Sequence, residues 1–163
     1  MGYTVGVITA SDKGARGERE DLSGPAIRAL IAAAGGETLR YLVLPDEIDL
    51  IAETLAAWAD AGDIDVILTT GGTGLTQRDI TPEATRRVIQ REAPGIAEAL
   101  RAESRKQTPM AMLSRGIAGV RNRTLIVNLP GSPKAVRECL EVLAPVLPHA
   151  VQLLAGPTES HPV

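Results

Sequence analysis

Aromatic residues are nearly absent from this sequence, which has one Trp, two Tyr and no Phe among 163 residues. A core must therefore be built from Ala, Val, Ile and Leu, which suits a parallel sheet covered by Ala-rich helices. The lack of aromatic side chains also argues against a platform that stacks single-stranded nucleic acid. Positive charge is not in excess either, since the formal net charge is −3. Non-specific nucleic-acid binding needs a basic surface, so we expect no nucleic-acid partner.

Cysteine and histidine are equally scarce. Cys139 is the single cysteine, which excludes an internal disulfide and a multi-cysteine metal site and suits a small buried hydrophobe. His149 and His161 stand apart from each other and lack metal-ligand spacing. We find neither a basic leader with a cleavage site nor an apolar run near the roughly 20 residues of a membrane span. These features predict a cytoplasmic protein with no membrane partner.

Apolar segments alternate between strand-like and helix-like periods, as in βαβ units. The length suits one domain over residues 1–163, with 156–163 as an extended tail. Asp46 and Thr81 are candidate helix N-caps, with Pro82 at a first helical position. Strands are expected at 3–10, 39–44 and 66–70, and helices at 23–34, 46–62, 81–91, 95–106, 133–143 and 145–155. Residues 116–120 and 124–129 flank three polar residues, which suggests a hairpin or a short irregular excursion.

The segment TTGGTGLTQRDITPEA at 69–84 carries the strongest signal. A strand that ends in a glycine loop and restarts as a helix exposes backbone N–H groups, which suits an anion. The pattern is neither a Walker A loop nor a dinucleotide fingerprint. A tight turn with positive φ would explain one or two of the glycines. Three glycines and two threonines at one strand end favour contact with a ligand.

Asp46 and Asp79 each follow an expected strand, and ligands bind at the carboxyl ends of parallel strands. Asp46 could be only a helix cap, and Asp79 only a solvated loop carboxylate. Together, beside a loop suited to phosphate, they predict a Mg²⁺ site, because Mg²⁺ is usually held by one or two carboxylates, substrate phosphates and water.

Two further segments reach the same expected edge. PGSPK at 130–134 could be only a helix start with proline, but the N–H groups of Gly131 and Ser132, with Lys134 nearby, would also hold a phosphate. SDK at 11–13 is either an ordinary turn or part of the site.

Four motifs occur in the order seen in the molybdopterin adenylyltransferases, the Mog/MoaB family of molybdenum cofactor biosynthesis. They are ITASDK at 8–13, LPDE at 44–47, the segment 69–84 and NLPGSPK at 128–134. QLLAGP at 152–157 is also similar, so the resemblance covers essentially the whole chain. It implies an α/β fold, a three-layer α/β/α sandwich with a mostly parallel central sheet that assembles as a homotrimer or, in some members, a hexamer. Longer members carry extra residues before the C-terminal motif, so this chain resembles the compact members.

The resemblance also implies ATP, Mg²⁺ and molybdopterin as ligands. Asp46 and Asp79 match the two family aspartates implicated in the chemistry and in metal binding. Other positions match regions that line the family's pocket: Ser11, Asp12, Gly71, Gly72, Thr73, Gly74, Arg78, Ser114, Arg115, Asn128, Pro130, Gly131, Ser132 and Lys134.

The expected reaction is Mg²⁺-dependent transfer of AMP from ATP to the terminal phosphate of molybdopterin, which releases pyrophosphate and activates the pterin for molybdate insertion. The protein that inserts molybdate is a candidate partner. Since the pterin phosphate is the nucleophile, the absence of a Ser/His or Cys/His constellation agrees with this reaction. The alternatives are a non-catalytic carrier that binds molybdopterin or a nucleotide, and a nucleotide pyrophosphatase, for which the sequence offers no evident general base.

Overall fold

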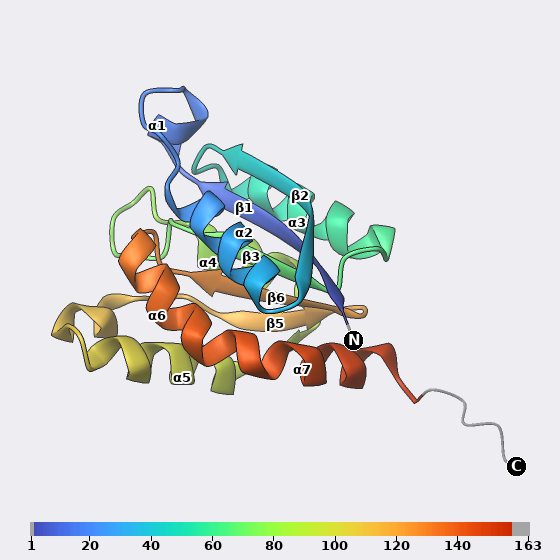
Figure 1. Ribbon diagram of the computed structural model, residues 1–163. Coiled ribbons are helices and arrows are strands. Elements are labelled where there is room, and N and C mark those ends of the chain that lie inside the picture. The colour runs from blue at the N-terminus through green and yellow to red at the C-terminus, as the bar shows by residue number, and fades with distance from the viewer. Residues whose placement is uncertain (1, 158–163) are drawn as a thin grey trace, which may run out of the picture.

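A six-stranded sheet forms the middle layer of the protein in the computed structural model, which describes residues 2–157 (Figure 1). The strand order is β2-β1-β3-β6-β5-β4. The strands are β1 (Tyr3–Ala10), β2 (Gly36–Leu44), β3 (Val66–Thr70), β4 (Arg91–Glu92), β5 (Ala118–Arg121) and β6 (Thr124–Leu129). The neighbouring strands from β2 to β6 pair in parallel, whereas β5 pairs antiparallel with both β6 and β4. The mostly parallel sheet is confirmed.

Helices cover both faces of the sheet, which confirms the three-layer α/β/α sandwich. One face carries α2 (Ser23–Ala33), α5 (Pro94–Arg105), α6 (Pro133–Leu143) and α7 (Leu147–Ala155), and the other carries α3 (Ile48–Ala61) and α4 (Thr81–Val88) (Figure 1). Three short segments complete the described chain: α1 (Asp12–Ala15), η1 (Pro109–Leu113) and η2 (Ala144–Val146).

The two cores follow from the alternation of side chains along each strand. On β1, Val5 and Val7 belong to the core beneath α2 and α6, whereas Ile8 belongs to the core beneath α3 and α4. The one tryptophan, Trp58 of α3, packs into the second core. Apart from Tyr3 and Trp58, aliphatic side chains and Cys139 fill both cores, as the composition requires.

Three predictions of local structure are wrong. Asp46 does not cap α3, because Glu47 takes the cap position and the Asp46 carboxylate accepts the N–H of Asp12 instead. Thr81 is the first residue of α4 and not its N-cap, so Pro82 is the second. The helix expected to reach residue 91 ends at Val88, after which β4 adds a short edge strand.

The hairpin and the C-terminal helices agree with expectation. β5 and β6 form an antiparallel hairpin that turns at Asn122, whose φ is +53°. The helical stretch Pro133–Ala155 is long and apolar enough to cross a membrane by length and composition alone. Its inner face, however, belongs to the core of the domain through residues that include Val136, Leu140 and Leu147. The expected tail at 156–163 lies outside the described residues beyond Pro157.

Candidate functional site

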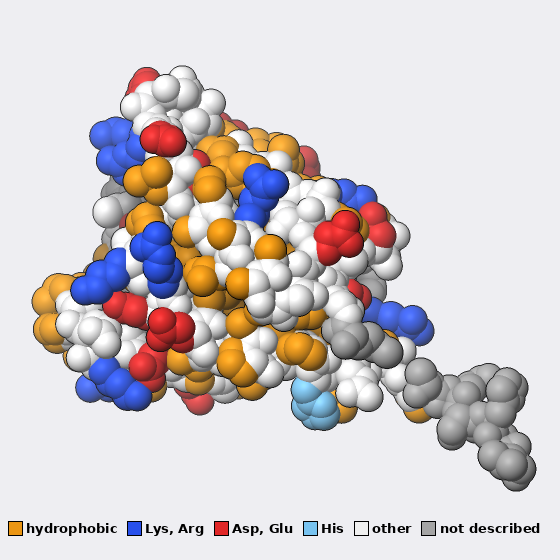
Figure 2. All heavy atoms as spheres, viewed as in Figure 1, with side chains coloured by type: hydrophobic (Ala, Val, Ile, Leu, Met, Phe, Trp, Pro, Cys, Tyr) orange, Lys and Arg blue, Asp and Glu red, His pale blue; other side chains and the backbone are white. Residues whose placement is uncertain are grey.

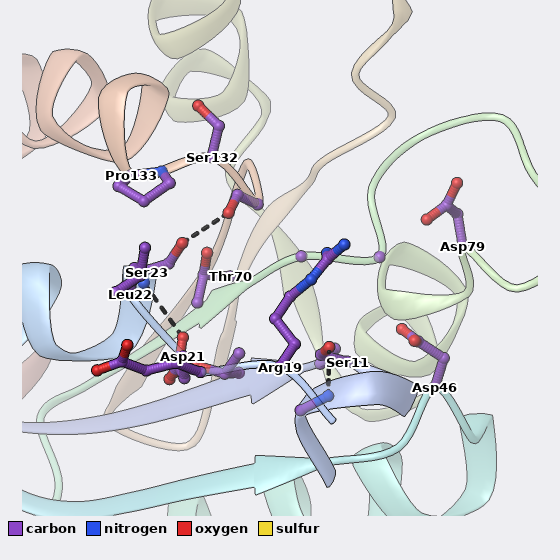
Figure 3. Close-up of a pocket in the computed structure, with 17 residues that line it drawn as sticks. Ser11, Arg19, Asp21, Leu22, Ser23, Asp46, Thr70, Asp79, Ser132 and Pro133 are labelled. Carbon is purple, nitrogen blue, oxygen red and sulfur yellow. Dashed lines mark hydrogen bonds between the residues drawn. The ribbon is translucent and has the colours of Figure 1, made fainter. Parts of the chain in front are cut away.

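A cavity of about 670 Å³ opens at the carboxyl ends of β1 and β3, where the topology predicts a ligand site (Figure 3). Its walls come from the end of β1, the loop between α1 and α2, the start of the glycine loop and the turn before α6. Seven of the predicted site residues line it: Ser11, Asp46, Gly71, Gly72, Asp79, Gly131 and Ser132. The convergence of separate motifs at one sheet edge is therefore confirmed.

The first two glycines of the loop are required by both conformation and space. Gly71 and Gly72 have φ values of +90° and +67°. A Cβ atom on Gly72 would lie 2.3 Å from Oγ1 of Thr81 and 3.1 Å from Oδ1 of Asp46. A Cβ on Gly71 would lie 2.5 Å from the carbonyl oxygen of Ala10. Only glycine lets the loop pass this close to β1 and α4.

Arg115 fixes the remainder of the glycine loop. Its guanidinium donates to the carbonyl oxygens of Gly74 at 2.7 Å and Asp79 at 2.6 Å, and it forms an ion pair with Glu83. Its backbone N–H donates to the carbonyl oxygen of Thr73 at 2.8 Å. Arg115 is thus a support of the loop in this structure and does not itself line the cavity.

Asp46 is held through Asp12. The Asp46 carboxylate accepts the Asp12 N–H at 3.0 Å, and Arg78 donates two bonds to the Asp12 carboxylate at 2.9 and 2.8 Å. Burial raises the pKa of the Asp46 carboxyl above its ordinary value, and the charges of Asp12 and Asp79 act in the same direction. The hydrogen bond from Arg78 lowers the pKa of Asp12. The charge of Asp12 is therefore paired with Arg78, whereas the charge of Asp46, which faces the cavity, forms no ion pair among the described residues.

Asp79 lies on the same side of the cavity as Asp46 (Figure 3). Its carboxylate accepts the N–H and the hydroxyl of Thr76 at 2.9 and 2.8 Å through one oxygen, Oδ2. Among residues 2–157, no group of three or more His, Cys, Asp or Glu side chains is placed to hold a metal ion. A cation on this pair of aspartates would therefore need further oxygen ligands from substrate and water.

The turn before α6 forms the opposite wall. The Ser132 hydroxyl accepts the Ala135 N–H at 3.1 Å and caps the helix. The Ser23 hydroxyl donates to the carbonyl oxygen of Gly131 at 2.6 Å, and the Thr70 hydroxyl to that of Pro130 at 2.7 Å. These bonds tie β3 and α2 to the turn.

Several predicted site residues do not line this cavity. Asn128 is 5% exposed and spans the sheet and α4, since its amide donates to the hydroxyls of Thr69 and Thr85 at 3.0 and 2.9 Å. Ser114, Asn128 and Pro130 line a second cavity of about 220 Å³ between α5, η1 and α6. The others outside the wall of the first cavity are Asp12, Thr73, Gly74, Arg78, Arg115 and Lys134.

Residues 19–23 form a part of the cavity wall that the sequence did not predict. Asp21 lies there just before the N-cap residue of α2, and its carboxylate accepts the N–H groups of Ser23 and Gly24, each at 3.1 Å. Its other oxygen accepts the hydroxyls of Thr9, at 2.8 Å, and Tyr41. Burial, followed by the hydrogen bond to Asp21, raises the pKa of Tyr41 to about 12. An aspartate two residues before a Ser-Gly-Pro helix start was the available signal.

Comparison with known proteins gives a consistent answer over most of the chain. Residues 6–149 match the family model described as "Probable molybdopterin binding domain". The molybdopterin adenylyltransferase of Helicobacter pylori strain J99 is 47% identical over 93% of this chain and 88% of its own length. That of Escherichia coli K12 is 37% identical over 94% of this chain and 86% of its own length. The structure of the molybdopterin biosynthesis enzyme MoaB from Thermus thermophilus is 55% identical, with a TM-score of 0.89 over 95% of this chain and 98% of that one. This chain belongs to the molybdopterin-binding family of molybdenum cofactor biosynthesis proteins that includes MoaB and the molybdopterin adenylyltransferases.

Proposed function

We propose that this protein transfers AMP from ATP to the terminal phosphate of molybdopterin and releases pyrophosphate. The observation that carries the proposal is that Asp46 and Asp79 lie on one wall of a cavity that the glycine loop also lines. Its support is the 47% identity to a relative named for this activity. The acceptor phosphate is ionised at neutral pH, so the protein need not supply a nucleophile or a base.

The residues that line the cavity are consistent with a reaction in which the protein supplies neither a nucleophile nor a base. The hydroxyls of Ser23 and Thr70 already donate to backbone carbonyls, and no histidine among the described residues lines the cavity. Cys139 is buried in the core away from this cavity, and burial raises the pKa of its thiol. The protein's own contribution is to hold two anionic substrates in line for attack.

The chain supplies phosphate-binding groups at two places. The N–H group of Gly72, which lines the cavity, donates to no backbone acceptor within residues 2–157 and is free for a phosphate oxygen. The N-terminus of α6 adds the N–H groups of Gly131 and Ser132, with Lys134 in its first turn.

Mg²⁺ fits the donor set of this site. Asp46 and Asp79 are hard oxygen donors, and the pKa of Asp46 is raised chiefly by burial, with smaller contributions from the charges of Asp12 and Asp79. Two carboxylates leave positions for substrate phosphates and water, as Mg²⁺ prefers. When bound, the ion would neutralise charge on the triphosphate and on the leaving pyrophosphate. Asp46 and Asp79 are the residues that would hold it.

We further propose a cytoplasmic homo-oligomer, with a trimer favoured over a hexamer, that hands its product to the protein that inserts molybdate. Large apolar side chains are exposed on the edge strand β2 and on η1, among them Leu42 and Met110 at 43% and 63% (Figure 2). Burial of such side chains between copies would be favourable. The mass of the protein in solution, measured by light scattering, tests the oligomeric state.

The test of function is pyrophosphate release from ATP and Mg²⁺, with and without molybdopterin, while adenylylated pterin is followed by chromatography. Pterin-dependent release with equal amounts of product supports the adenylyltransferase. Tight pterin binding without release would instead indicate a carrier. Release of AMP without pterin would indicate a pyrophosphatase.

A further inference from the structure

Arg19 is the one cationic side chain among the described residues that line the main cavity. It belongs to the loop between α1 and α2. Figure 3 shows its side chain rising from that loop into the cavity, with Ser23 and Thr70 on one side and Asp46 and Asp79 on the other. In this view the guanidinium lies between Ser132, at the turn before α6, and the two aspartates.

Arg19 forms no ion pair within residues 2–157. The neighbouring arginines behave differently. Arg16 of the same loop pairs with Glu18 at 2.9 Å, and Arg78 is engaged by Asp12 at 2.8 Å. Arg19 therefore has all of its donors available to an anion that enters the cavity.

The wall around Arg19 is acidic, with Glu20, Asp21, Asp46 and Asp79 in it. Hydrogen bonds from four donors satisfy the Asp21 carboxylate, so it does not require Arg19 as a partner. A phosphorylated substrate would meet repulsion from the remaining carboxylates. A single free guanidinium in the same space offsets that repulsion and offers paired N–H groups to phosphate oxygens.

We propose that Arg19 binds a phosphate group of a substrate in this cavity, a role that rests on the proposed function. The phosphate is either part of the nucleotide triphosphate or the terminal phosphate of the pterin. The position is distinct from the glycine loop and the α6 N-terminus, which bind through backbone N–H groups.

The experiment measures the dissociation constants of Mg²⁺–ATP and of molybdopterin separately, by calorimetry, for the native protein and Arg19→Gln. The matched control is Arg16→Gln, which removes the same charge from the same loop outside the cavity. We expect Arg19→Gln to weaken binding of one ligand about tenfold, the size of a lost charged hydrogen bond, and Arg16→Gln to change neither ligand by more than about twofold. Arg19→Lys should recover only part of the loss, because lysine binds phosphate as a point charge.

The two separate binding measurements identify which substrate phosphate Arg19 binds. Weakening confined to Mg²⁺–ATP places Arg19 on the triphosphate, and weakening confined to molybdopterin places it on the pterin phosphate. Unchanged binding of both ligands in Arg19→Gln, or an equal loss in Arg16→Gln, overturns the inference while leaving the proposed function intact. A native protein that binds neither ligand overturns both.

Discussion

Asp12 and Asp46 are joined by two reciprocal hydrogen bonds, in which the backbone N–H of each residue donates to the carboxylate of the other at 3.0 Å. Asp12 begins α1 just after β1, and Asp46 follows β2. The fork from Arg78 to Asp12 adds the glycine loop to the same cluster. Three loops far apart in the sequence thus fix the direction in which Asp46 faces the cavity.

Asp12→Ala should therefore impair turnover although Asp12 is outside the cavity wall. The backbone N–H of Asp46 loses its acceptor and Arg78 loses its carboxylate partner, so Asp46 is no longer fixed in position. Misplacement of a positioned group costs about tenfold or more in rate. We expect kcat to fall about tenfold and the Mg²⁺ concentration for half-maximal rate to rise. Lys13→Gln, next in the chain and outside the cavity wall, is the control and should leave both values unchanged. Equal kcat in Asp12→Ala and the native enzyme would contradict the positioning role.

Asp79→Asn tests the metal-binding role directly. The amide oxygen can still accept the Thr76 donors, so the loop should keep its conformation. The lost negative charge removes a ligand that Mg²⁺ prefers, and we expect kcat to fall at least about 100-fold with a Tm within about 2 °C of the native value. Steady-state kinetics over a Mg²⁺ series, with a thermal melt of the same sample, provides both readings. A native rate with normal Mg²⁺ dependence would refute the assignment.

The sequence predicted the elements whose signals are local. β1 and β3 are rich in apolar and β-branched residues and are almost wholly buried, and the glycine loop carries its own conformational requirement at Gly71 and Gly72. β4 escaped prediction because Arg91 and Glu92 are exposed and have no apolar pattern. Their strand exists only because β5 pairs with it.

Long-range partners account for what the sequence misassigned in the site. The Asp46 carboxylate could have capped α3, but a donor 34 residues earlier in the chain, the N–H of Asp12, takes it. Arg115 carries no local sign that it supports Gly74 and Asp79. Arg19 was missed because one arginine in a polar loop has no pattern, and only the fold turns it into the cavity.

We expect Asn128 to contribute to the stability of the fold and not to substrate binding. Its buried amide donates to Thr69 and Thr85, and its oxygen accepts the Ile117 N–H at 3.1 Å. Asn128→Ala leaves those groups without partners and should lower the free energy of unfolding by about 2–3 kcal/mol in a denaturant titration. Gln107→Ala, which removes an exposed amide that makes no side-chain hydrogen bond among residues 2–157, is the matched control and should cost less than about 1 kcal/mol. Weaker substrate binding in folded Asn128→Ala would instead support a role in the site.

Arg115→Lys should separate support of the glycine loop from general stability. Lysine cannot reach two carbonyls and a carboxylate with one planar fork, so the loop should loosen. We expect kcat/KM to fall about tenfold or more. Arg121→Lys is the matched control, because Arg121 also bonds a carboxylate, Asp60, and a carbonyl, that of Val88, but lies at β5 away from the cavity. It should lower Tm without changing kcat/KM, and a similar loss of rate in both variants would contradict a specific role for Arg115.

Asp46→Asn should stabilise the protein while it abolishes turnover. Burial and the neighbouring carboxylates raise the pKa of Asp46 in the folded protein, so its ionised form opposes folding at neutral pH. An amide keeps the oxygen that accepts the Asp12 N–H and removes the charge. At pH 7 without Mg²⁺ we expect Tm to rise by about 2 °C, a gain that accompanies loss of function at strained sites.

The size of that Tm difference depends on pH. As the pH falls through the folded-state pKa of Asp46, the native carboxyl takes up a proton and its cost disappears, so the two melting curves should converge in acid and separate as the pH rises. Melts of both proteins from pH 4 to pH 8 measure this directly. Glu47→Gln, a charge change at the next residue, is the control and should show no such convergence, because Glu47 is exposed and its side chain forms no ion pair among residues 2–157. A Tm difference between Asp46→Asn and the native protein that is the same at every pH would mean that the charge of Asp46 does not destabilise the folded protein.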